Sequence, residues 1–111
     1  AMAPLSYLEM LALEQHARLI LTDSGGVQRE AYFCHVPCVV VREETEWDEI
    51  RAQGWSQLVP CQRQAITEAV RTFHACGPWT ELFGDGRAAG RIAESLLDAP
   101  VMTQLQPIGV R

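Results

Sequence analysis

Residues 22–30 carry the residue types of a phosphate-binding turn. Ser24, Gly25 and Gly26 stand between an apolar run and a segment with helical spacing. Glycine lets backbone N–H groups approach an anion without a β-carbon in the way. A helix amino terminus adds unpaired N–H groups and the positive end of a dipole. The Ser24 hydroxyl is therefore predicted either to cap this helix or to bind a phosphate oxygen.

Glu30 extends this pattern by one helical turn. It follows Gly26 by four residues, so it lies on the same side of the predicted helix, about 6 Å further along its axis. A nucleotide with its phosphates at Gly25 and Gly26 would place its ribose hydroxyls against Glu30. A simpler interpretation stays open, in which the glycines only form a turn and Glu30 is a solvated helix residue.

Two further polar clusters follow other elements. Arg42 stands directly after the second apolar run, so it should share the sheet edge of Ser24. We expect Arg42 to be paired within the protein, because five carboxylates follow it closely: Glu43, Glu44, Glu46, Asp48 and Glu49. Asp85 precedes the last helical segment, where a turn or cap residue is expected.

The overall composition excludes several classes of partner. The chain has 111 residues, with 9 Lys+Arg against 14 Asp+Glu, a net charge of −5. An acidic chain without a basic block argues against nucleic acid and anionic membranes. No apolar run approaches the roughly 20 residues of a membrane helix. The four cysteines lack a C-x-x-C pair, which predicts free thiols in a reducing, cytoplasmic compartment and no metal site.

Apolar spacing predicts alternating helices and strands. Helices are expected over 4–16 (amphipathic and started by Pro4), 26–35, 46–53, about 66–73 and 89–97, and buried strands over 19–22, 37–41 and 57–59. Uniformly apolar strands indicate a parallel sheet with helices on both faces, a three-layer α/β fold. We expect one domain over residues 3–99 and a tail over 100–111. A sheet with so few strands suggests a part of something larger.

Four ordered motifs carry a family resemblance. They are TDSGGVQREA at residues 22–31, PCVVVR at 37–42, TEW at 45–47 and GDG at 84–86. The chain resembles the carboxyl-terminal part of the non-hydrolysing UDP-N-acetylglucosamine 2-epimerases over residues 4–98. The resemblance implies a partial Rossmann-like sheet, half of a glycosyltransferase-B-type carboxyl-terminal domain. It also implies interconversion of UDP-GlcNAc and UDP-ManNAc by elimination and re-addition of UDP.

The resemblance also implies site residues. Ser24, Gly25 and Gly26 would contact the diphosphate and Glu30 the ribose, in agreement with the geometry above, while Leu5 and Met10 would touch the uracil. Many bacterial members have an arginine that can contact the UDP-sugar where this chain has Trp47. Trp47 is therefore only a secondary candidate for contact with the ligand. Arg42 is also a secondary candidate, because it is expected to be paired with a nearby carboxylate.

The same comparison implies what this chain lacks. The acid/base carboxylates and the histidine of the family lie in segments before residue 1, so no catalytic residue is expected here. We expect a chain that binds UDP or UDP-GlcNAc without a cofactor and is inactive alone. It should form a homodimer, either by pairing at the apolar edge of its first strand or by swapping a terminal helix. The alternatives are a non-catalytic UDP-sugar-binding or regulatory module, a hydrolysing epimerase and a glycosyltransferase.

Overall fold

The computed structural model describes residues 1–98, and the predicted tail at 100–111 lies outside them. Contacts divide the chain into two units, Ala1–Thr80 and Glu81–Arg111. The first unit contains α1 (Tyr7–His16), β1 (Ile20–Thr22), α2 (Gly25–Phe33), β2 (Cys38–Val41), α3 (Asp48–Ala52), β3 (Ser56–Val59) and α4 (Arg63–Thr72), and the second contains α5 (Ala88–Asp98). None of the helices within residues 1–98 is long and apolar enough to cross a membrane.

The described strands form one parallel sheet in the order β1-β2-β3. Ile20 pairs with Cys38, and Cys38 pairs in turn with Ser56, so the three strands start level with one another. The central strand β2 is buried over its first three residues, whereas β1 lies at an edge of this sheet. Because all strands run the same way, the segments that follow β1 and β2 leave from the same edge.

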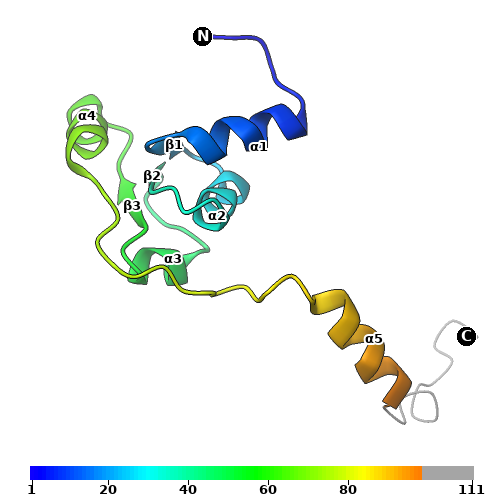
Figure 1. The fold of residues 1–111 in the computed structure, drawn as a ribbon. Helices are drawn as coiled ribbons and strands as arrows, with labels where there is room; N and C mark the ends of the chain where they lie inside the picture. Colours follow the sequence, from blue (N-terminus) through cyan, green and yellow to red (C-terminus); the bar gives the residue numbers. More distant parts are fainter. Residues whose placement is uncertain (99–111) are drawn as a thin grey trace, which may run out of the picture. The chain divides into compact units, whose positions relative to one another are not determined.

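Helices cover both faces of the sheet (Figure 1). On one face Cys38 and Val40 of β2 pack against Ala31 of α2. On the other face Val39 of β2 packs with Ala69 of α4. The alternation along β2 is the expected two-residue period of a strand, and it sends neighbouring side chains into two separate cores. The predicted three-layer α/β arrangement is confirmed.

The first helix differs from the prediction. It begins at Tyr7 and not at Pro4, because Ser6 and Glu9 form a capping box in which each side chain bonds the backbone N–H of the other residue. Its apolar residues do not form a buried stripe: Leu8 is 76% exposed, and the buried side chain of α1 is Glu14. The prediction that the first helix is amphipathic, with its apolar residues on one buried side, was wrong.

The first strand is also less buried than predicted. Leu21 is 46% exposed, and Ile20 is only partly buried. The reason is its position at the edge of the described sheet, where β2 contacts it on one side only. An exposed apolar edge strand with free backbone groups is a known route to association between chains.

The segment after α4 closes the first unit. α4 ends at Thr72, one residue before the expected end of this helix at about residue 73. Trp79 then stacks on Tyr32 of α2 with ring centroids 5.5 Å apart, and its indole N–H donates to the Tyr32 carbonyl at 2.8 Å. The Tyr32 hydroxyl donates to the Thr80 carbonyl at 2.5 Å. These contacts fix the carboxyl-terminal half of α2, while its amino terminus carries the candidate site. In the second unit, before the start of α5, Asp85 accepts hydrogen bonds from the Arg87 amide and the Arg91 side chain, as expected for a turn residue.

Candidate functional site

The start of α2 has the geometry of a capped helix at the carboxyl end of β1. Ser24 is the N-cap, and its hydroxyl accepts a hydrogen bond from the Val27 amide at 3.3 Å. The Ser24 amide in turn donates to the Thr22 hydroxyl at 3.0 Å. Of the two predicted roles for this hydroxyl, the structure records the cap. The helix begins at Gly25, one residue earlier than expected, so both glycines lie in its first turn.

The two glycines have different surroundings. A β-carbon on Gly25 would overlap the Glu46 carboxylate, with its Cδ at 2.9 Å, and would lie 3.2 Å from the Trp47 indole nitrogen. A β-carbon on Gly26 would meet only the Ser24 hydroxyl, at 3.7 Å. Gly25 is therefore required by the loop that packs on it, whereas Gly26 leaves the helix terminus open.

Glu46 places a negative charge at the helix terminus where a phosphate was predicted. Its carboxylate lies against Gly25, and its Oε2 is 3.0 Å from the Arg42 Nη1. The Arg42 side chain is thus paired within the protein, as expected for an arginine among carboxylates. An anion is favoured at this position because the first turn of a helix offers unpaired N–H groups and the positive end of a dipole.

The loop that carries Glu46 is held on α2 by a buried polar network. Gln28 is fully buried, and its amide accepts from the Thr45 hydroxyl at 2.9 Å and donates to the Ser56 hydroxyl at 3.2 Å. The Trp47 amide donates to the same Thr45 hydroxyl at 3.1 Å. The network joins α2, the loop and β3. Sequence reasoning missed it, although Gln28 stands at helical spacing from the buried Ala31.

Trp47 covers the first turns of α2. Besides its approach to Gly25, its ring lies under the Arg29 guanidinium, 4.9 Å from the ring centroid. This cation–π contact holds the indole against α2. The two secondary candidates, Arg42 and Trp47, are therefore brought to the start of α2 by one loop.

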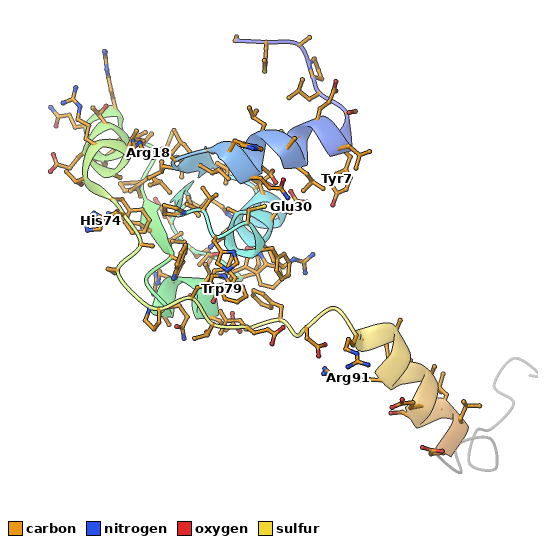
Figure 2. All side chains as sticks on the ribbon, in the orientation of Figure 1. Tyr7, Arg18, Glu30, His74, Trp79 and Arg91 are labelled. Carbon is orange, nitrogen blue, oxygen red and sulfur yellow. The ribbon has the colours of Figure 1, made fainter. Side chains whose placement is uncertain are left out.

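Glu30 lies one turn further along α2 and is partly buried. Figure 2 shows it on the side of α2 that α1 covers. The carboxyl group of Glu14 interacts with it from α1, and burial together with the charge of Glu30 raises the pKa of Glu14. Glu14 was not identified as a site residue from the sequence, because the helix over 4–16 was predicted from the spacing of its apolar residues.

The two residues predicted to touch uracil lie outside this turn. Met10 is in α1, and Leu5 is in the segment before it. Their exposed fractions are 36% and 37%, so both side chains are available at the surface of the first unit. α1 packs on α2, which is the helix that carries Gly25 and Glu30.

Cys34 and Cys38 have thiols whose surroundings keep them protonated. All four cysteines are free, and no group of three or more potential metal ligands occurs among the described residues. Burial raises the pKa of the Cys38 thiol to about 12, and burial with two nearby carboxylates raises that of Cys34. Both thiols are therefore protonated at neutral pH, and a thiol is a poor nucleophile and metal ligand compared with a thiolate.

Comparison with known proteins identifies the family. A family model described as UDP-N-acetylglucosamine 2-epimerase matches residues 1–97. The chain belongs to the UDP-N-acetylglucosamine 2-epimerase family. A UDP-N-acetylglucosamine 2-epimerase homolog of Methanococcus maripaludis is 46% identical over 95 residues, 85% of this chain. A UDP-2,3-diacetamido-2,3-dideoxy-D-glucuronate 2-epimerase of Pseudomonas aeruginosa is 46% identical over 97 residues, 84% of this chain.

A solved member of the epimerase family has the same fold. The UDP-GlcNAc 2-epimerase of Methanocaldococcus jannaschii in complex with UDP-GlcNAc and UDP superposes with a TM-score of 0.77 and 39% identity, over 88% of this chain. The chain spans only about 27% of the length of that protein and of the two relatives above. The predicted resemblance to part of an epimerase is thereby confirmed.

Proposed function

We propose that residues 3–99 form the UDP-binding part of an epimerase that acts on a UDP-2-acetamido sugar. The observation that carries the proposal is the amino terminus of α2, which lies at the carboxyl edge of the sheet and already holds a carboxylate at Gly25. A site that favours one anion also suits the diphosphate of a nucleotide sugar. The two relatives described above support the shared part of the ligand, since both are named for UDP-sugar substrates.

Each part of the ligand has a proposed partner. The diphosphate accepts hydrogen bonds from the first-turn N–H groups at Gly25 and Gly26 and from the Ser24 hydroxyl. Glu30 accepts hydrogen bonds from the ribose hydroxyls one turn further along the helix. Leu5 and Met10 contact the uracil from the α1 side. For the phosphates to enter at Gly25, the Glu46 carboxylate moves aside, which frees Arg42 to face them.

A titration of the chain with UDP tests this proposal. We expect a dissociation constant of about 0.1–1 mM or weaker, because a single open surface encloses little of the ligand. NMR shifts should appear in residues 24–30, and uridine should bind less well. Gly26→Ala is the matched variant, because its methyl group has space in the free protein but blocks the anion. It should weaken UDP binding and leave the weaker binding of uridine unchanged; equal effects on both ligands would contradict a diphosphate contact.

We further propose that residues 1–111 do not epimerise UDP-GlcNAc alone. Elimination of UDP requires a base for the proton at C2 and an acid for the departing group. The Glu46 carboxylate of the candidate site is paired with Arg42, and we expect the acid/base groups of the reaction in other segments of the enzyme. Incorporation of deuterium at C2 in heavy water measures the step directly. Protein-dependent exchange would contradict the proposal, whereas UDP binding without exchange would also fit a non-catalytic UDP-sugar-binding module.

The chain is also proposed to work in the cytoplasm. Its four cysteines are free, as is usual in a reducing compartment.

A further inference from the structure

Glu14 is a buried acid on a helix whose other side chains are at least partly exposed. It is 2% exposed, and it is the buried residue of α1, which packs on α2. Neither of its carboxyl oxygens accepts a hydrogen bond from any described residue. A buried carboxylate without donors is strongly disfavoured, and such groups usually keep their proton.

The groups around Glu14 also favour the protonated form. Glu14 interacts electrostatically with Glu30 of α2, with Cys34 directly after α2 and with Cys38 of β2. None of these side chains can carry a positive charge. Two ionised carboxylates repel each other, and neither can donate a hydrogen bond. A proton on Glu14 removes the repulsion and supplies the donor. Burial and the charge of Glu30 accordingly raise the pKa of Glu14.

The carboxyl groups of Glu14 and Glu30 differ in burial, which decides which of them holds the proton. Glu14 is the more deeply buried member, so it retains the proton, while the partly buried Glu30 keeps its access to solvent. An ionised carboxylate has about four lone-pair positions. One of them on Glu30 accepts the hydrogen bond from the Glu14 O–H group, and the others remain for ligand hydroxyls.

We propose that Glu14 is a positioning residue, whose carboxylic acid donates a hydrogen bond to Glu30 and fixes that carboxylate to receive the ribose hydroxyls of UDP. The inference rests on the ribose contact in the proposed function. No proton leaves the pair during binding. When the pH rises enough to ionise Glu14, the donor is lost, the two carboxylates repel, and Glu30 turns away from the ribose.

The test compares UDP with 2′-deoxy-UDP on the full chain. The measured quantity is the dissociation constant of 2′-deoxy-UDP divided by that of UDP. This ratio isolates the contribution of the ribose 2′-hydroxyl, because ionisation of the phosphates and the uracil cancels between the two ligands. For the wild-type protein we expect this ratio to fall about threefold to tenfold as the pH rises through the raised pKa of Glu14. Glu14→Gln keeps a donor at every pH and should hold the ratio constant. Glu14→Met has similar length without a donor and should give a low ratio throughout.

The outcomes separate the two proposals. If Glu14 only fills space, Glu14→Met will match the wild type at every pH, which overturns the positioning role. If Glu30→Gln leaves the ratio unchanged, the ribose contact itself is wrong. If Glu14 variants do not fold, carboxyl ¹³C signals of the wild type decide the matter. The chemical shift of the Glu30 carboxyl carbon should change when Glu14 ionises. A Glu30 chemical shift that does not change at that pH would overturn the proposed hydrogen bond.

Discussion

Replacement of Glu46 by glutamine should strengthen UDP binding, because the Glu46 carboxylate lies at Gly25 where the diphosphate is proposed to enter. In the free protein this carboxylate stabilises the helix terminus by about 0.3–1 kcal/mol, which UDP must replace. It also repels the incoming phosphates, by about 1 kcal/mol for unit charges 4 Å apart in water. The Glu46 side chain is 51% exposed, so the value for water applies better than that for a protein interior.

The two terms together predict a gain of about 1–2 kcal/mol, which is about fivefold to thirtyfold in affinity. UDP binding also breaks the surface ion pair between Glu46 and Arg42 in the wild type, and its absence from the variant adds only about 0–1 kcal/mol to this gain. The freed Arg42 also faces the diphosphate. Added salt should reduce the difference between variant and wild type, because the repulsion is screened.

NMR titration with UDP at fixed ionic strength measures this effect. Glu44→Gln is the matched control, since Glu44 is an exposed residue of the same loop and the substitution makes the same change in net charge. Equal affinities for the two variants would refute a local role of Glu46. Weaker binding by Glu46→Gln would show that Glu46 contacts the ligand and does not compete with it.

Three further outcomes are expected. Gly54→Ala should destabilise the fold by about 1–3 kcal/mol in chemical denaturation, because Gly54 has φ +79° and an added β-carbon would lie 2.7 Å from Cys76 Sγ. The chain should form a homodimer through β1, and Leu21→Lys should shift light scattering across a dilution series towards monomer; a wild-type monomer at every concentration would contradict this. Because the pKa of Glu14 is raised in the fold, stability should fall as the pH rises from about 4.5 through that raised value. Glu14→Gln should remove this loss, so its advantage in melting temperature should grow with pH; an equal advantage at about pH 4 and about pH 8 would contradict it.

Local signals in the sequence were sufficient for the sheet and for the start of α2. The uniformly apolar run at 38–41 indicated a strand buried on both faces, and the structure places it in the centre. Ser24 before two glycines indicated a cap at the end of a strand. These features depend on residues that are neighbours in the chain, so periodicity and capping preferences were enough.

The contacts that shape the site could not be predicted in this way. Glu46 meets Gly25 across twenty-one residues, and the loop conformation that brings them together depends on the buried amide of Gln28. The inward side of α1 is likewise set by its contact with α2, which selects Glu14 although leucines predominate in that segment. Sequence spacing gives the period of a helix but not the partner that decides which of its sides is covered.

In the proposed binding mode, the carboxylates of Glu46 and Glu30 place opposite demands on a bound nucleotide. At its first turn, Glu46 must leave for the phosphates to bind, so a negative charge there opposes UDP. One turn further on, Glu30 must stay charged to accept the ribose hydroxyls, and a proton on Glu14 removes the repulsion that would displace it. A ligand with a diphosphate alone gains only the first interaction and a nucleoside alone only the second. Preference for a nucleoside diphosphate over either part then follows from one helix, because the spacing of Gly26 and Glu30 is fixed by its turn.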